Sequence, residues 1–271
     1  MTDLVLNDLD IGNIRKLDYL MSRDRDFPIR EQGATRRYLL CSTARCGSTL
    51  VGDILHRSGL AGDPQEYLNG RLIAAYLRAA NRLDGKVNIF DYLDDIETRR
   101  TSENGVFGIK VHFEHVLSLW QKKNRDALKF LQRFDKIILL TRQDKLAQAV
   151  SLHKARSTQI WTSEDYQFLE DDDPRKTRKA SYDPFRISRA LGDILLQENG
   201  WKSTLSSAKL KFGVIQYEDF VANPDNRTRQ LFNYLDLPEP TEQLVPSVQR
   251  QSRGADPLLE AFRKEIGLTD Q

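Results

Sequence analysis

Short apolar runs alternate with stretches of helical periodicity along most of the chain. Residues 37–41, 106–111, 136–141 and 212–217 have the length and apolar content of strands. The third run is apolar nearly throughout, as a strand covered on both faces should be. Helical spacing surrounds these runs, for instance at Leu50, Val51, Ile54 and Leu55. This order predicts an α/β fold in which helices flank a central, mainly parallel sheet.

The first 35 residues differ from the rest because they are polar and of mixed charge. We expect residues 1–35 to form an N-terminal arm with one short helix through Leu17 and Leu20, and residues 36–271 to form a single domain. The acidic-to-basic run at 170–179 is typical of a solvated loop.

Charge and composition argue against several classes of protein: nucleic-acid binders, membrane-spanning proteins and disulfide-rich proteins. The 271 residues include 41 Lys+Arg and 39 Asp+Glu, so the net charge of +2 argues against a dedicated nucleic-acid binder. The longest aliphatic run, 137–140, is far too short to span a membrane, and the start has no signal-peptide pattern. Two cysteines form no disulfide framework. We expect a cytoplasmic protein with no integral membrane segment.

The segment 42–49, rich in small and polar residues, lies between a predicted strand and a predicted helix. Unpaired N–H groups and the helix dipole make such a turn suitable for phosphate or sulfate. Gly47 allows close approach, Ser48 and Thr49 offer hydroxyls, and Arg45 offers a fork of donors. The lysine of a Walker loop is missing, which disfavours magnesium-dependent phosphoryl transfer. A Ser/Thr-rich helix cap without a ligand is the structural alternative.

Cys46 has two interpretations. A cysteine-based phosphatase needs an arginine six residues after its cysteine, and positions 47 and 52 are both glycine. At a helix N-terminus the Cys46 thiol could have a lowered pKa. The alternative is a small loop residue with no special reactivity.

A second anion site is suggested by Arg142 and Ser151. Arg142 directly follows the apolar run 136–141, at the strand end where open α/β sheets bind ligands. Ser151 lies about two helical turns further on. The two residues reach one ligand only if the helix folds back beside the strand end.

Four segments together resemble sulfotransferases. RYLLCSTARCGSTL at 37–50 resembles their 5′-phosphosulfate loop, and LTRQDKLAQAVSL at 140–152 resembles their 3′-phosphate segment. GDPQEY at 62–67 narrows the resemblance to the bacterial trehalose 2-sulfotransferase-like family, and residues 215–220 resemble a late segment common to sulfotransferases. The resemblance covers roughly residues 36–265.

The resemblance implies a three-layer α/β fold that uses 3′-phosphoadenosine 5′-phosphosulfate (PAPS) to sulfate a hydroxyl of a carbohydrate or glycolipid, trehalose-like by analogy. Relatives suggest a homodimer. Cys46 stands where a serine is usual, so its backbone amide would matter more than its thiol. By analogy Arg142 and Ser151 hold the 3′-phosphate, and the 5′-phosphosulfate is held by Arg45, Cys46, Gly47, Ser48 and Thr49.

Glu66 is the candidate catalytic base, because the resemblance places the carboxylate there. The alternative is structural: Asp63, Pro64 and Glu66 also fit the start of a helix with a capping box. His112, with His115 beside it, is a rival base. Sulfuryl transfer needs less counter-charge than phosphoryl transfer, so we expect no metal.

Two other functions remain open on the sequence. A nucleotide kinase-like enzyme would need magnesium, and a non-catalytic binder would hold 3′,5′-adenosine bisphosphate (PAP) without turnover. The basic run at 249–254, with Arg250 and Arg253, could close over the 3′-phosphate or form an ordinary surface turn.

Overall fold

A four-stranded parallel sheet forms the centre of the computed structural model, which describes residues 2–3, 11–82, 86–120, 124–240, 244, 246 and 256–268. The strand order is β4-β2-β5-β6, and Leu39 of β2 lies between Ile109 of β4 and Ile137 of β5. The strands are β2 (Arg36–Ser42), β4 (Val106–His112), β5 (Lys136–Thr141) and β6 (Gly213–Gln216). The predicted parallel sheet is thereby confirmed.

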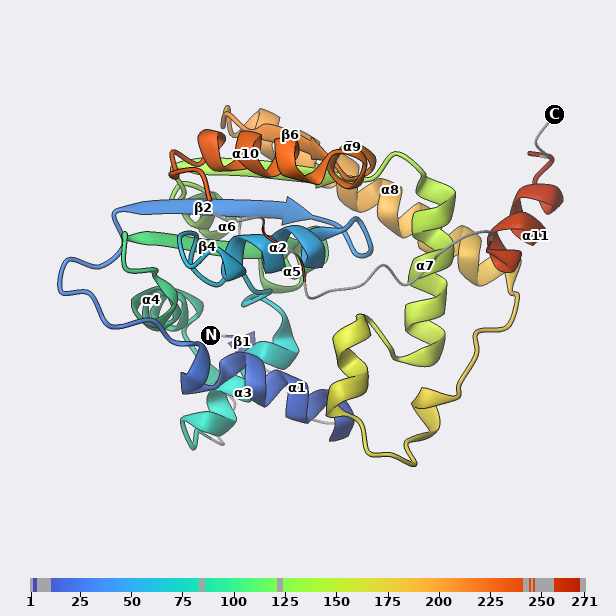
Figure 1. The fold of residues 1–271 in the computed structure, drawn as a ribbon, viewed down its shortest axis with the longest axis horizontal. Coiled ribbons are helices and arrows are strands. Elements are labelled where there is room, and N and C mark those ends of the chain that lie inside the picture. Colours follow the sequence, from blue (N-terminus) through green and yellow to red (C-terminus); the bar gives the residue numbers. More distant parts are fainter. Residues whose placement is uncertain are drawn as a thin grey trace.

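Helices connect and cover these strands (Figure 1). A separate antiparallel pair joins β1 (Thr2–Asp3) to β3 (Lys86–Val87). The α-helices are α1 (Ile11–Met21), α2 (Ser48–Arg57), α3 (Gly70–Ala79), α4 (Ile89–Arg100), α5 (Phe113–Trp120), α6 (Asn124–Leu131), α7 (Lys145–Thr158), α8 (Pro184–Ser207), α9 (Tyr217–Ala222), α10 (Pro224–Tyr234) and α11 (Pro257–Glu265), and the 3-10 turns are η1 (Arg23–Arg25), η2 (Ser163–Phe168) and η3 (Pro174–Lys176).

Alternating side chains of the strands give the sheet two buried faces. In β2, Leu39 and Cys41 belong to a core shared with α3, α4 and α8, whereas Tyr38 and Leu40 pack with α2, α9 and α10. Successive residues of a strand point to opposite faces, so a run buried on both faces reads as continuously apolar. The result is the three-layer arrangement that the family resemblance implied.

The carboxyl ends of the strands meet at one edge, where a ligand crevice is expected in an open α/β sheet. The β2 arrow points toward α7, which lies beyond this edge (Figure 1). Trp201 of α8 fixes the end of β2, because its indole N–H donates to the carbonyl oxygen of Ser42 at 2.9 Å. This hydrogen bond ties α8 to the strand end from which the β2–α2 turn leaves.

The short helix predicted within the N-terminal arm is confirmed as α1, which packs against α3 and η2. No helix in the described part of the chain combines the length and apolar character needed to cross a membrane.

Candidate active site

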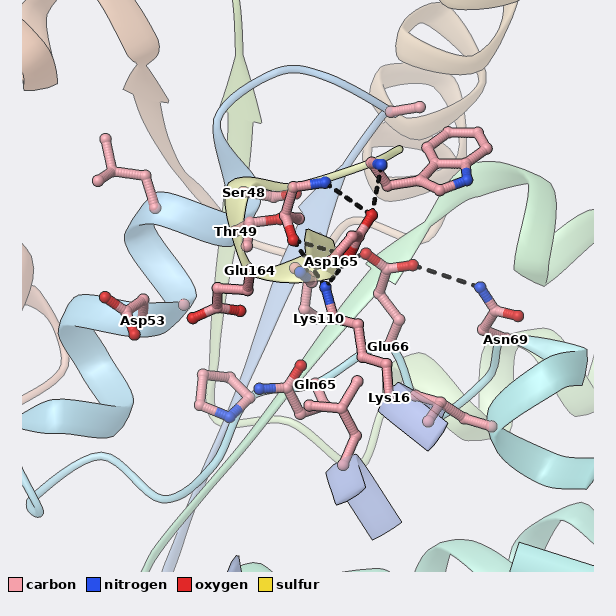
Figure 2. A pocket seen from close by; sticks show the side chains of 18 of the residues that line it. Lys16, Ser48, Thr49, Asp53, Gln65, Glu66, Asn69, Lys110, Glu164 and Asp165 are labelled. Atoms are coloured by element: carbon pink, nitrogen blue, oxygen red, sulfur yellow. Dashed lines mark hydrogen bonds and ion pairs between the residues drawn. The ribbon is translucent and has the colours of Figure 1, made fainter. Parts of the chain in front are cut away.

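A cavity of about 1000 Å³ lies at the carboxyl edge of the sheet. Its walls come from α1, the turn between β2 and α2 with α2 itself, the loop before α3, the end of β4, Arg142 after β5, Ser151 in the middle of α7 and the segment 161–168. Figure 2 shows Ser48 and Thr49 on one side of this space and Glu66, Lys110 and Lys16 on another. The cavity brings together segments that are far apart in the sequence.

The β2–α2 turn presents a helix start that no side chain caps. Its N-cap residue, Gly47, has φ +91°, a left-handed conformation that glycine adopts without a steric penalty. A Cβ atom at Gly47 would lie 2.2 Å from Cδ2 of Tyr217, so the ring leaves no room for a side chain. Gly47, Ser48 and Thr49 all line the cavity. The turn has the uncapped amides that an anion site requires.

Arg45, Arg142 and Ser151 meet in one wall of the cavity. Nε of Arg45 donates to Oγ of Ser151 at 3.0 Å, and Nη1 of Arg142 donates to the carbonyl oxygen of Arg45 at 3.3 Å. Ser151 of α7 and Arg142 therefore both lie next to Arg45, and these hydrogen bonds join each of them to Arg45 and not to one another. Burial lowers the pKa of Arg45, and the charge of Arg142 lowers it further.

The two arginines make this wall suitable for a multiply charged anion. Nε of Arg142 is buried without a hydrogen-bond partner among the described residues, and a buried donor of this kind is costly unless a ligand completes it. A phosphate or sulfate oxygen would supply the missing acceptor.

Tyr217 and Glu218 hold Arg142 in place. Neither residue was among the site residues predicted from the sequence. The guanidinium of Arg142 lies over the Tyr217 ring, 5.1 Å from its centroid, and its Nε is 3.9 Å from Oε1 of Glu218. Glu218 also accepts hydrogen bonds from the backbone N–H groups of Gln143 (2.8 Å) and Asp144 (3.1 Å). The resemblance at 215–220 was the available signal for both residues.

Cys46 stands apart from the other predicted donor-site residues because its side chain belongs to the core with Leu40 and Val51 and does not line the cavity. Burial raises the pKa of the Cys46 thiol, so the hypothesis of a lowered pKa is wrong. Its backbone N–H donates weakly to Thr43, at 3.4 Å. A buried, protonated thiol matches the interpretation of Cys46 as a small loop residue.

The segment around Glu66 is a loop, and the capping-box interpretation of this segment is wrong. Helix α3 begins only at Gly70, where the side chain of Asn69 accepts from the N–H of Arg71 at 3.0 Å. Asp63 does not cap a helix, because its buried carboxylate binds Arg25 at 2.6 Å and Arg100 at 2.9 Å. Glu66 has no capping role, because no helix starts between Asp63 and Glu66.

Glu66 lies at the centre of a charged cluster in the cavity wall. Its Oε1 is 3.2 Å from Nζ of Lys110 and 3.3 Å from Nε2 of His112, and its Oε2 accepts from Asn69 at 3.5 Å. Burial alone would raise the pKa of Glu66, but the charges of His112 and Lys110 outweigh it and hold this pKa well below the usual range. Glu66 is therefore a carboxylate at neutral pH.

The rival bases belong to the same cluster. Nδ1 of His112 lies 2.8 Å from Oγ of Ser42, which fixes the ring with its other nitrogen toward Glu66. Burial and the neighbouring His112 lower the pKa of His115 to about 3, so His115 is neutral at physiological pH. Nδ1 of His115 accepts from the backbone N–H of His112 at 3.3 Å, which suits that neutral state.

Asp63 anchors the loop that carries Glu66. Burial opposes its ionisation, but the hydrogen bonds and charge of Arg25, with His56 and Arg100, lower the pKa of Asp63. Arg25 comes from η1, so the N-terminal arm supplies one of the partners that fix this loop. No motif in the sequence linked Arg25 to Asp63 across 38 positions.

Three aromatic side chains fall into two groups. Tyr67 and Trp120 are core residues, whereas Trp161 lines the cavity. The basic run with Arg250 and Arg253 lies outside the described residues. Within the described ranges, no three His, Cys, Asp or Glu side chains are arranged to bind a metal ion.

Comparison with known proteins gives the family. Residues 37–264 match the model of the Stf0 sulphotransferase family. The trehalose 2-sulfotransferase of Mycobacterium tuberculosis is 29% identical over 202 residues, which cover 63% of this chain and 73% of that protein. The corresponding enzyme of Mycolicibacterium smegmatis is 26% identical over 197 residues, with 61% and 71% covered.

Two solved structures are more distant. A sulfotransferase from Alicyclobacillus acidocaldarius has a TM-score of 0.42 and 15% identity, with 87% of this chain and 94% of that chain covered. The sulfotransferase domain from the curacin biosynthetic pathway has a TM-score of 0.40 and 12% identity, with 87% and 99% covered. The match over residues 37–264 is the decisive one, and it shows that this chain belongs to the Stf0 sulphotransferase family.

Proposed function

We propose that the protein transfers a sulfuryl group from PAPS to a hydroxyl of a carbohydrate or glycolipid of the trehalose type. One observation carries the proposal: a single cavity is lined by the paired arginines Arg45 and Arg142 and by the carboxylate of Glu66. A donor with two phosphate sites needs the first feature, and a hydroxyl acceptor needs the second. The two relatives named trehalose 2-sulfotransferase support the choice of acceptor.

The donor would lie along the wall formed by the β2–α2 turn and the start of α7. Arg45 and the uncapped amides after Gly47 would hold the 5′-phosphosulfate, together with the hydroxyls of Ser48 and Thr49. Arg142 and Ser151 would hold the 3′-phosphate, and the Nε of Arg142, which has no hydrogen bond within the described residues, would donate to it. Cys46 would contribute through the backbone, because its side chain is in the core.

Glu66 would act as the base in an in-line transfer. Its carboxylate takes the hydroxyl proton while the acceptor oxygen forms a bond to sulfur and the bond from sulfur to the 5′-phosphate oxygen breaks. The products are a sulfate ester, PAP and a proton on Glu66. Positioning and electrostatics supply most of the rate, as in phosphoryl transfer, and the small charge on the transferred group removes the need for a metal.

Lys110 and His112 would keep Glu66 ionised and oriented. A carboxylate with a strongly lowered pKa is a weak base, so proton transfer to it depends on close contact with the acceptor hydroxyl. The contacts at 3.2 and 3.3 Å fix Oε1 of Glu66 and leave its second oxygen with only the long contact to Asn69. That second oxygen is the one available to an acceptor.

A transfer assay tests the proposal. Labelled-sulfate transfer from PAPS to trehalose, other sugars, glycolipids and small alcohols is measured with magnesium chelated. We expect turnover on trehalose or a related sugar, and Glu66→Gln should lower kcat roughly 10²–10⁴-fold, the usual contribution of a catalytic base.

PAP binding by calorimetry is the control, because Glu66→Gln should leave the dissociation constant of PAP within about twofold of the parent. Tight PAP binding without transfer to any acceptor would contradict the proposal and indicate a non-catalytic binder. Turnover of Glu66→Gln at the parent rate would place the base elsewhere.

A further inference from the structure

Helix α1 forms a wall of the cavity although it lies outside the residues that match the family. The match begins at residue 37, whereas Lys16, Leu17, Tyr19 and Leu20 all face the cavity. We propose, resting on the function above, that α1 is part of the acceptor site and that Lys16 is a specificity-determining residue for polyhydroxylated acceptors.

The position of α1 is fixed from several sides. It packs against α3 and η2, and Asp18 pairs with Arg78 of α3 at 2.6 Å. The ring of Tyr19 lies 5.5 Å from that of Phe168 in η2. Directly after the helix, Arg25 binds Asp63 in the loop that carries Glu66. These contacts fix α1 as part of the cavity wall, and the Arg25–Asp63 ion pair connects it to the loop that carries the proposed base.

Lys16 occupies an enclosed position in this wall. Its Nζ donates to Oγ1 of Thr162 at 2.7 Å and pairs with Asp165, and the two charged side chains are only 15% and 6% exposed. Asp165 also accepts from the N–H groups of Trp161 and Thr162 and so organises the turn before η2. Figure 2 shows Lys16 and Asp165 in the same part of the cavity as Glu66.

An ammonium group has three donors, and the contacts of Lys16 within the described part of the chain use two of them. The third N–H is available to an oxygen atom in the cavity that Lys16 lines.

A carboxylate and an ammonium group lining one cavity would together favour an acceptor with more than one hydroxyl group. One hydroxyl would meet Glu66 and react, and a second would accept from Lys16 of α1 in the same part of the cavity. A sugar such as trehalose satisfies both contacts, whereas a simple alcohol satisfies only the first. Lys16 would therefore favour sugars over mono-alcohols without touching the donor.

Three variants separate recognition from structure. Lys16→Met should raise the KM for trehalose roughly 10- to 100-fold, the value of a lost charged hydrogen bond, with the KM for PAPS within twofold. Lys16→Arg should restore most of the affinity. The double variant Lys16→Met with Asp165→Asn removes the uncompensated carboxylate, and we expect it to keep the high KM.

The matched control is Arg15→Met, because Arg15 is next to Lys16 and pairs with Glu170 at 2.5 Å, yet both side chains are more than half exposed. We expect no change above twofold in either KM. The inference is overturned if Lys16→Met leaves the KM for trehalose unchanged, raises both KM values equally, or is rescued by Asp165→Asn.

Calorimetry of trehalose binding to the PAP complex separates this inference from the proposed function. If the parent transfers no sulfate, the proposed function fails, and binding then decides the role of Lys16. Heat of trehalose binding that disappears in Lys16→Met but persists in Arg15→Met supports the inference. Equal heats in all three proteins, or no heat in any of them, overturn it.

Discussion

The two turns that leave β2 and β5 reach the same edge of the sheet and start their helices in opposite ways. Helix α2 begins after Gly47 with no side-chain cap. Helix α7 begins after Asp144, whose carboxylate accepts from the N–H of Ala147 at 2.8 Å. The first helix start leaves its amides open, and the second is already satisfied by its own sequence.

The difference shows two ways of building an anion site at one strand edge. The β2–α2 turn offers backbone N–H groups and the dipole of a helix. The β5–α7 turn offers a side chain, Arg142, supported by the ring of Tyr217 and the carboxylate of Glu218. An uncapped helix start is a cost in the free protein that a ligand removes, whereas a capped start contributes stability at all times.

The largest effect on stability is expected at Gly47, because the β2–α2 turn has no room for a side chain at this position. Gly47→Ala combines a left-handed φ with a Cβ atom 2.2 Å from the Tyr217 ring, so we expect a loss of about 2–4 kcal/mol in the free energy of unfolding. PAP affinity should fall with it. Denaturant unfolding and calorimetry measure the two effects.

Gly192→Ala is the matched control, because a Cβ atom at this position in α8 would meet no heavy atom within 4 Å. This substitution should leave stability equal or raise it by up to about 1 kcal/mol. Similar behaviour of the two variants would show that the β2–α2 turn does not depend on glycine.

Arg142 tests the side chain of the second turn. Arg142→Met should weaken PAP binding by roughly 1.5–3 kcal/mol, the value of a charged hydrogen bond. Arg156→Met is the control: Arg156 lies on α7, the helix that follows Arg142, and pairs with Asp193 at 3.0 Å. Unchanged PAP affinity in Arg142→Met would remove this arginine from the site.

Removing the cap of α7 should lower the stability of the fold and leave the affinity for PAP unchanged. Asp144→Ala should cost about 1 kcal/mol of unfolding free energy, and the dissociation constant of PAP should change less than twofold. Asn88→Ala removes the corresponding cap of α4, where Asn88 accepts from Phe90 at 3.0 Å, and should behave alike. A large change in PAP affinity for Asp144→Ala alone would mean that the start of α7 also binds the donor.

The smallest effect is expected from pH. Guanidinium groups stay charged and backbone N–H groups stay neutral donors between about pH 5 and 8, and the pKa of Glu66 is lowered well below its usual range. We therefore expect kcat at saturating substrates to stay within about twofold between pH 8 and 5. An imidazole base would instead lose activity as pH falls below about 7.

The same lowered pKa makes a prediction about stability. The ionised state of Glu66 stabilises the folded protein fully above the unfolded pKa of about 4.3, and this contribution is lost as pH falls through the folded pKa. Glu66→Gln should therefore flatten part of the acid limb of the unfolding curve. Identical curves for the parent and Glu66→Gln would contradict the lowered pKa.

Local patterns were enough to predict the strands, because the four apolar runs became β2, β4, β5 and β6. Helix caps such as Asp144 before α7 and Asn223 before α10 depend on equally local residues. At Asp63 the same reasoning was wrong, because a good capping residue formed buried ion pairs with Arg25 and Arg100 instead. Helix propensity is worth tenths of a kcal/mol, and a buried carboxylate with two arginine partners outweighs it.

The sequence by itself determined the order of the elements, the glycine turn and the residue types that favour an anion, because these depend on spacing along the chain. Only the tertiary structure decided that Lys16 joins the wall of the cavity, that the Cys46 thiol faces the core, and that Glu66 lies between Lys110 and His112. Those facts depend on which distant segments meet, and burial and charge act through such contacts.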